Sequence, residues 1–177
     1  MPPMSGPHDL LLLEDAELLA QCEVDVYRAS GPGGQHRNKV SSAVRLRHGP
    51  TGLEASGEES RSQHENKRRA VHRLRMKIAT ALRTPAPPDA RVPPILRECV
   101  VGRGVGRRLE VGRRDRRYWP VVAFLLDLLD GAEGRVGDAA RAVGATTGSV
   151  VAVLKADRHA LAAAQQIRRR HNKTPLN

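Results

Sequence analysis

Residues 28–39 read Arg28-Ala29-Ser30-Gly31-Pro32-Gly33-Gly34-Gln35-His36-Arg37-Asn38-Lys39, a glycine-rich stretch flanked by cations. Three glycines in four residues around a proline cannot continue a helix or strand, and they let the backbone approach a ligand closely. Period-two alternation in residues 23–28 and 43–48 predicts two strands joined by this long exposed loop. Residues 49–52 are a turn signal, and residues 53–56 are the expected hairpin partner of the second strand.

A basic helix is predicted after these strands, because the apolar period becomes helical from Ser60. The residues on its apolar face are Ala70, Val71, Leu74, Ile78, Ala81 and Leu82. Cations crowd the rest of the segment from Arg61 to Arg83, where Glu65 is the only acid. Like charges one turn apart lower the stability of a helix unless a polyanion neutralises them, so we expect this helix to contact RNA phosphates. A solvated charged face is the alternative.

The remainder of the chain has a different character. Residues 91–117 are rich in arginine and glycine, which is typical of a linker or of an arm that contacts RNA. Residues 136–153 resemble a helix–turn–helix with Gly144 in the turn. The would-be second helix has only Lys155 as a cation, which favours a helical bundle over a DNA reader. The residues expected to pack this bundle are Val121, Phe124, Leu125, Leu128, Val143, Val150 and Leu154.

These patterns predict an α+β fold, in which a small domain with a short mixed or antiparallel sheet and a packed basic helix precedes an all-α region. Residues 1–84 would hold a short N-terminal helix and the loop-bearing domain. Residues 85–117 would be the proline-containing, Arg/Gly-rich linker or RNA-contacting arm. Residues 118–177 would form the helical bundle with its helix–turn–helix-like segment.

The amino-acid composition favours a nucleic acid as the binding partner. The 177 residues contain 30 Lys and Arg against 19 Asp and Glu, a formal charge of +11, which is typical of a chain kept near a polyanion. The only aromatic residues are Tyr27, Tyr118, Trp119 and Phe124, too few for a protein that stacks many bases of a single strand. Contacts with the backbone and shape of structured nucleic acid are therefore expected.

Neither a membrane nor a metal is expected. No apolar run is long enough to span a bilayer, and the N-terminus resembles neither a cleavable signal nor a transit peptide. Cys22 and Cys99 lie far apart without a CxxC partner, which excludes a disulfide framework and a cysteine zinc site. We expect a cytoplasmic protein.

One motif carries a resemblance to a known family. The run from Ser30 to Gln35, followed by Asn38-Lys39, resembles the GGQ loop of class I peptide chain release factors and their codon-independent rescue relatives. The resemblance continues through residues 42–46, 50–52 and 61–67 in the family's order, and it covers residues 20–82. Four collinear blocks are far more specific than a bare Gly-Gly-Gln.

The resemblance implies hydrolysis of the ester of peptidyl-tRNA in the peptidyl-transferase centre of the large ribosomal subunit, without cofactor or metal. Gly33 and Gly34 would permit the backbone geometry. The N–H of Gln35 would stabilise the oxyanion, and its side chain would help to admit water. Gln35 is also a candidate for N5-methylation. The predicted RNA-binding residues are Arg28, His36, Arg37, Asn38, Lys39, Arg61, Gln63, Asn66, Lys67 and Arg68.

Several alternatives stay open at this point. His36 could act as a general base, although a histidine in a basic loop is more often a donor to RNA. Few residues precede the match, so we expect no decoding domain and a codon-independent monomer that rescues either stalled ribosomes or split large subunits. A non-hydrolytic ribosome-binding factor and a DNA-binding regulator using the C-terminal helices are the competing functions. The same helices could also dock a protein partner.

Overall fold

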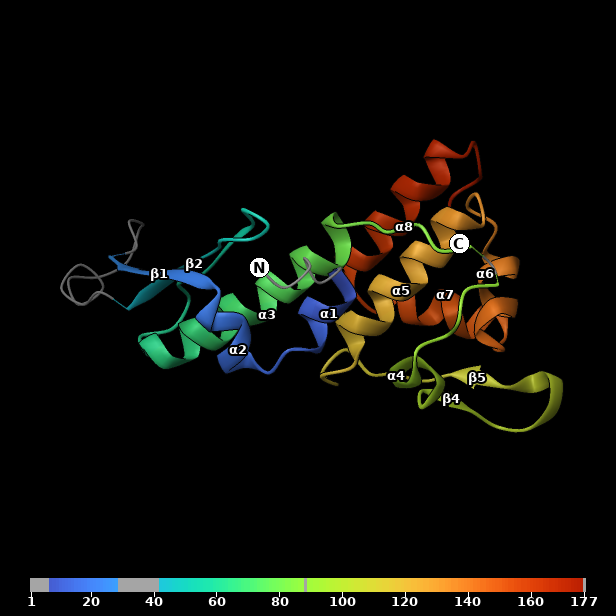
Figure 1. Ribbon diagram of the computed structural model, residues 1–177, viewed down its shortest axis with the longest axis horizontal. Coiled ribbons are helices and arrows are strands. Elements are labelled where there is room, and N and C mark those ends of the chain that lie inside the picture. The colour runs from blue at the N-terminus through green and yellow to red at the C-terminus, as the bar shows by residue number, and fades with distance from the viewer. Residues whose placement is uncertain (1–6, 29–41, 88, 177) are drawn as a thin grey trace. The chain divides into compact units, whose positions relative to one another are not determined.

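A computed structural model describes residues 7–28, 42–87 and 89–176 (Figure 1). They form two compact units. The N-terminal unit is Leu12–Ile78, and the C-terminal unit combines Met1–Leu11 with Ala79–Asn177. The predicted α+β class with helices in the C-terminal part is confirmed.

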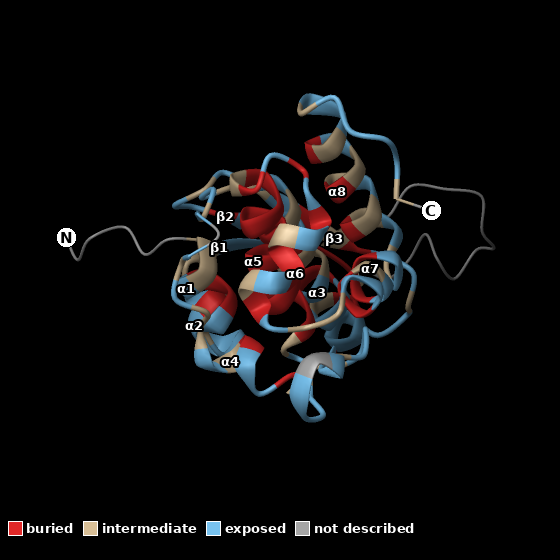
Figure 2. Ribbon diagram, turned by 90° about the vertical axis from the view of Figure 1, so that its right-hand side faces the viewer, coloured by how far each residue is buried: buried red, intermediate tan, exposed pale blue. Residues whose placement is uncertain are grey.

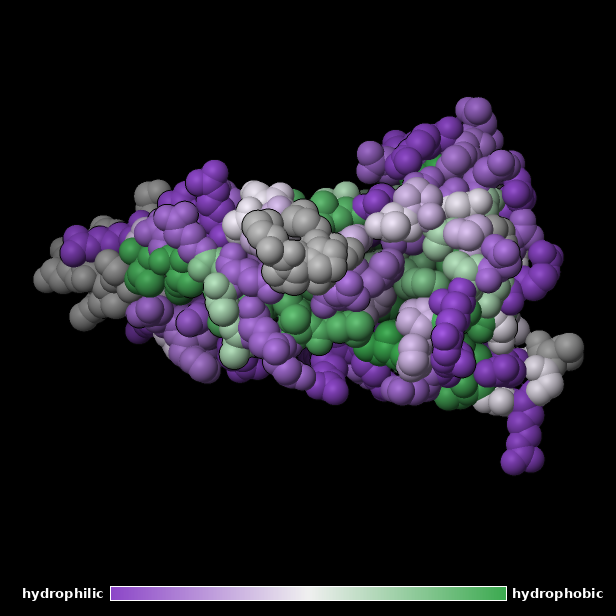
Figure 3. Space-filling view, in the orientation of Figure 1, coloured by the Kyte–Doolittle hydropathy of each residue, from purple (hydrophilic) through white to green (hydrophobic). Residues whose placement is uncertain are grey.

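The N-terminal unit contains a three-stranded antiparallel sheet in the order β1-β2-β3. Its elements before the basic helix are α2 (Asp15–Ala20), β1 (Cys22–Tyr27), β2 (Ala43–His48) and β3 (Glu54–Gly57). In β2 the side chains of Val44 and Leu46 are buried while those of Arg45 and Arg47 are exposed. The alternation in the sequence therefore predicted the strand and its buried face correctly. β1 is an edge strand, and the space-filling view shows apolar surface over it (Figure 3).

Helix α3 (Gln63–Ala81) supplies the other part of this core. Ala70, Val71, Leu74 and Ile78 are buried along one face of the helix, as the helical period predicted. At the end of this face the prediction was wrong, because Ala81 is exposed and Leu82, which follows the helix, is only half-buried. The start of α3 lies unusually close to the end of β3. A Cβ atom added to Gly57 would stand 2.1 Å from the backbone oxygen of Asn66, so only glycine fits there.

The C-terminal unit is built around one buried helix. Its helices are α1 (Pro7–Leu12), α4 (Pro94–Arg97), α5 (Tyr118–Gly131), α6 (Val136–Val143), α7 (Thr147–Lys155) and α8 (Arg158–Arg170). Every residue of α5 from Tyr118 to Asp130 is buried (Figure 2). A helix that is apolar on nearly all sides must be covered on nearly all sides, and α4, α6, α7 and α8 contact it.

The predicted helical bundle is confirmed, since all seven residues expected to pack it are buried. The segment predicted to resemble a helix–turn–helix consists of two helices joined by a short turn. Gly144 ends α6 in the left-handed conformation with φ 74°, and α7 begins three residues later.

A buried carboxylate joins the two separate stretches of sequence that form the C-terminal unit. Asp127 of α5 is fully buried, and its oxygens lie 2.7 Å from His8 Nε2 and 2.9 Å from Arg83 Nη1. It also accepts a hydrogen bond of 3.1 Å from the backbone N–H of Thr84. Three partners compensate the desolvation of this charge, and they fix α1 and the segment after α3 to α5.

The Arg/Gly-rich segment contains structure that the sequence did not predict. Besides α4 it holds a hairpin of β4 (Val100–Val101) and β5 (Arg108–Leu109), with the 3-10 turn η1 (Gly104–Gly106) between the strands. Strands of two residues are too short to produce a readable alternation. None of the helices in the described ranges is both long and apolar enough to span a bilayer.

Candidate functional site

The predicted catalytic residues Gly33, Gly34 and Gln35 lie outside the described residues, as do His36, Arg37, Asn38 and Lys39. The structure describes both ends of the segment that carries them. Tyr27 at the end of β1 stands opposite Ala43 at the start of β2. The loop is therefore attached to the unit through two directly paired strands.

Side-chain contacts on the exposed face of the sheet hold the end of β1 that leads into the loop. The guanidinium of Arg45 stacks 5.2 Å from the ring centre of Tyr27 and lies 3.0 Å from the carboxylate of Asp25. The Tyr27 hydroxyl donates to Glu58 at 3.2 Å, and burial raises the pKa of this phenol. These contacts link the last residues before the loop to β2 and to the segment after β3.

Asn66 has a different role from the RNA contact predicted for it. Its side chain is fully buried. Its Nδ2 donates 2.7 Å hydrogen bonds to the carbonyls of Ser42 and Ser60, and its Oδ1 accepts a 2.9 Å bond from the N–H of Ser60. Asn66 therefore fastens the residue that follows the loop to α3, and its amide is fully occupied within the fold.

The spacing of Asn66 from the apolar residues of α3 could have predicted that its side chain is buried. Asn66 stands four and eight residues before Ala70 and Leu74, which places it on the buried face of α3. A buried amide must find hydrogen-bond partners inside the protein, so a structural assignment was available from the spacing alone.

The cations of α3 divide into two groups, and the first group is used within the unit. Arg69 and Arg73 both pair with Glu59. Arg75 lies 2.8 Å from the carboxylate of Asp15. Lys77 donates a 2.6 Å hydrogen bond to the carbonyl of Glu54. These cations stabilise the packing of α3 on its neighbours.

The second group is Lys67 and Arg68, and two more predicted RNA-binding residues lie nearby in the chain, Gln63 at the start of α3 and Arg61 just before it. Arg61, Gln63 and Arg68 are exposed and Lys67 is half-buried. Within the described part of the chain their side chains make no hydrogen bond or ion pair. Cations and amides left without partners on one end of a helix are the groups that a phosphate backbone can engage.

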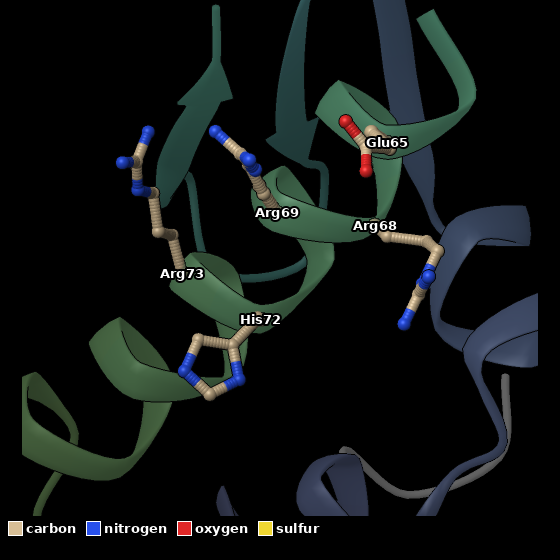
Figure 4. Close-up of a pocket in the computed structure, with 5 residues that line it drawn as sticks. All are labelled: Glu65, Arg68, Arg69, His72 and Arg73. Carbon is tan, nitrogen blue, oxygen red and sulfur yellow. The ribbon is translucent and has the colours of Figure 1, made fainter. Parts of the chain in front are cut away.

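A shallow pocket runs along this side of α3. Figure 4 shows its lining residues Glu65, Arg68, Arg69, His72 and Arg73. Arg69 and Arg73 are directed toward the strands, whereas Arg68 points to the opposite side. Arg69 and Arg73 are paired with Glu59. Arg68, which has no partner among the described residues, is therefore the guanidinium of this pocket that can attract an anion.

Glu59 holds two of these guanidinium groups in place. Burial acts to raise the pKa of Glu59, but hydrogen bonds from Arg73 and from the backbone N–H groups of Glu58 and Glu59 outweigh it and lower the pKa to about 2. The carboxylate therefore stays ionised over the whole physiological range. In the described residues no group of three or more His, Cys, Asp or Glu side chains could hold a metal ion.

A scan against known protein families identifies the segment that contains the sheet, α3 and both ends of the loop. Residues 18–92 match the RF-1 domain. The resemblance to the GGQ domain of class I peptide chain release factors is confirmed for this part of the chain. Gly33, Gly34 and Gln35 fall within the matched RF-1 domain, while the helices from α4 onward lie beyond it.

Known release factors are similar to this chain over the same part. Peptide chain release factor 1 of Acidiphilium cryptum is 40% identical over 97 residues, which is 55% of this chain and 24% of the relative. Peptide chain release factor 2 of Buchnera aphidicola subsp. Baizongia pistaciae is 55% identical over 56 residues, 32% of this chain and 15% of the relative. Peptide chain release factor 1 of Leptothrix cholodnii is 52% identical over 64 residues, 36% and 18% respectively. The chain therefore spans less than a quarter of the length of these relatives.

Proposed function

We propose that this chain releases nascent peptides by hydrolysing the ester of peptidyl-tRNA in the peptidyl-transferase centre of the large ribosomal subunit. The observation that carries the proposal is an intact Gly33-Gly34-Gln35 sequence inside a segment that matches the RF-1 domain. The similar proteins from three organisms are peptide chain release factors.

The chemistry assigned to the loop requires no nucleophile from the protein. Gly33 and Gly34 allow the backbone to approach the ester, and the N–H of Gln35 stabilises the oxyanion that forms when water attacks the carbonyl carbon. The Gln35 side chain admits water and excludes larger nucleophiles, and it is the proposed site of N5-methylation. The ribosome and the terminal ribose of the tRNA supply the remaining groups.

Positioning on RNA is assigned to the cations around the loop and on α3. Arg61, Gln63, Lys67 and Arg68 support this role because they lack side-chain partners among the described residues. Phosphate contacts of this kind orient a protein without reading sequence. Codon-independent rescue is the finer part of the proposal. The loop and its flanking blocks resemble both class I release factors and their rescue relatives, so the choice between the two depends on the release assay.

The test is peptide release from ribosomes stalled on a message without a stop codon, with isolated large subunits carrying peptidyl-tRNA as a second substrate. Wild-type protein should release peptide from at least one of them, and Gly34→Ala should abolish release. Gly112→Ala is the matched control, since an added Cβ there meets nothing within 4 Å.

Each result assigns a function. Release that is lost only in Gly34→Ala supports a hydrolase acting at the loop, and the preferred substrate tells a stalled ribosome from a split subunit. Ribosome binding without release in any variant would instead identify a non-hydrolytic factor. Release that requires a stop codon would overturn codon independence.

A further inference from the structure

Most of the excess positive charge lies outside the unit that carries the loop. Residues 12–78 contain 12 Lys and Arg against nine Asp and Glu, whereas residues 79–177 contain 18 against nine. Arginine is densest in residues 97–117, which hold eight arginines and three acids. This excess needs an explanation of its own, because residues beyond 92 lie outside the RF-1 match.

The β4–β5 hairpin presents part of this charge from a fixed position beside α7 (Figure 1). Leu109 of β5 is buried, and its N–H donates a 3.0 Å hydrogen bond to the hydroxyl of Ser149. The N–H of Thr146 donates a 2.9 Å bond to the carbonyl of Arg107. These bonds join β5 and the residue before it to the first turn and the N-cap residue of α7, so the hairpin is attached to the α6–α7 turn and is not a free arm.

The arginines of this hairpin face solvent. Arg103 and Arg107 are exposed, and within the described ranges their side chains make no hydrogen bond or ion pair. Arg108 is paired only weakly, at 3.7 Å from Glu110, with both side chains more than half exposed. A Cβ added to Gly144 would stand 3.8 Å from Nη1 of Arg107, so this guanidinium lies beside the α6–α7 turn.

We infer that the arginines of the β4–β5 hairpin and the adjoining α6–α7 turn form a second binding surface, which takes the phosphate backbone of structured RNA. Guanidinium groups match phosphate geometry and need no particular base. Positive φ at Gly102 and Gly104 shapes the turn, and without side chains these residues let a backbone come close.

Apart from the hairpin arginines, the elements beside this surface offer little for reading or stacking on bases. Helix α7 has no exposed Arg, Asn or Gln, the side chains that read bases in the major groove of DNA. Its exposed residues are Thr147, Gly148, Ala152 and Lys155. The aromatic residues of the C-terminal unit, Tyr118, Trp119 and Phe124, are all buried in α5 and cannot stack on bases. Duplex RNA is recognised largely through its backbone and shape, which fits this surface.

The test measures binding of the full chain to an RNA duplex of about 20 base pairs, and to DNA of the same sequence, from roughly 50 to 300 mM salt. In the hairpin variant, Arg103, Arg107 and Arg108 are replaced by glutamine. The control variant loses the same charge at three exposed arginines outside the hairpin, Arg91, Arg158 and Arg169.

For the RNA duplex we expect the slope of log K against log salt to fall by about two to three in the hairpin variant, near one per phosphate contact, with affinity at low salt falling about tenfold. The control should change the slope by less than about one. Equal losses in the two variants would overturn the inference, as would a hairpin effect seen with DNA alone.

A second variant keeps the test decisive if the hairpin variant misfolds. Thr147→Glu places a carboxylate in the first turn of α7, where a negative charge stabilises the helix. It should preserve folding and still weaken RNA binding several-fold, because the new charge repels phosphate. Undiminished RNA affinity in Thr147→Glu would contradict the proposed surface. No ribosome takes part in these measurements, so their outcome is independent of the peptide-release assay.

Discussion

Replacing Gly57 by alanine places a methyl group where the structure has no room for one. The added Cβ would stand 2.1 Å from the backbone oxygen and 2.9 Å from the backbone carbon of Asn66. The obstructing atoms belong to the backbone of α3, so no side-chain rotation can relieve the clash. Either β3 or the start of α3 must move.

The cost follows from that displacement. Backbone shifts forced by overpacking cost about 1–3 kcal/mol. Movement of α3 also strains the three hydrogen bonds that Asn66 makes with Ser42 and Ser60, each worth about 1 kcal/mol. We therefore expect Gly57→Ala to lower the free energy of unfolding by about 3–5 kcal/mol, a large part of a typical domain's stability.

Urea unfolding followed by far-ultraviolet circular dichroism measures this loss. Gly49→Ala is the matched control in the same unit, since its added Cβ would stand an ordinary 3.5 Å from the Gln21 carbonyl. The fluorescence of Trp119, the single tryptophan, reports separately on the C-terminal unit. A loss below about 1 kcal/mol in Gly57→Ala, or equal losses in the two variants, would refute the steric argument.

Two further predictions concern charges on the N-terminal unit. The folded-state pKa of Glu59, lowered to about 2, lies below its ordinary value of 4.5, so its stabilising contribution is present above pH 4.5 and is lost as the pH falls toward 2. Glu59→Gln should lack this loss, about 1 kcal/mol because the side chain is 41% exposed, and equal acid sensitivity in both proteins would contradict the assignment. The double variant Lys67→Gln and Arg68→Gln should require about tenfold more protein for half-maximal peptide release, since it removes two phosphate contacts. Arg158→Gln with Arg169→Gln removes the same charge from exposed positions of the C-terminal unit and should have little effect, and equal effects of the two pairs would refute the role of α3.

The sequence by itself determined the features that depend on residues close together in the chain. Alternation in residues 43–48 predicted the buried face of β2, and the helical period of residues 70–78 predicted that of α3. The loop motif and its flanking blocks indicated the family from the order of residues alone, and the match to residues 18–92 confirms the resemblance. The sequence likewise predicted a helical bundle in residues 118–177, and the seven residues expected to pack it are buried.

Only the tertiary structure decided how equivalent side chains are used. Arg68 and Arg73 are both arginines of one basic helix, yet Arg73 is held by a glutamate 14 residues earlier while Arg68 has no partner among the described residues. Asn66 lies within a block predicted to bind RNA and instead joins α3 to the end of the loop. The hairpin is fixed by Ser149, 40 residues after Leu109. Periodicity predicts which face of an element a residue occupies. The residue that it contacts there comes from a distant part of the chain, and only the tertiary fold brings the two together.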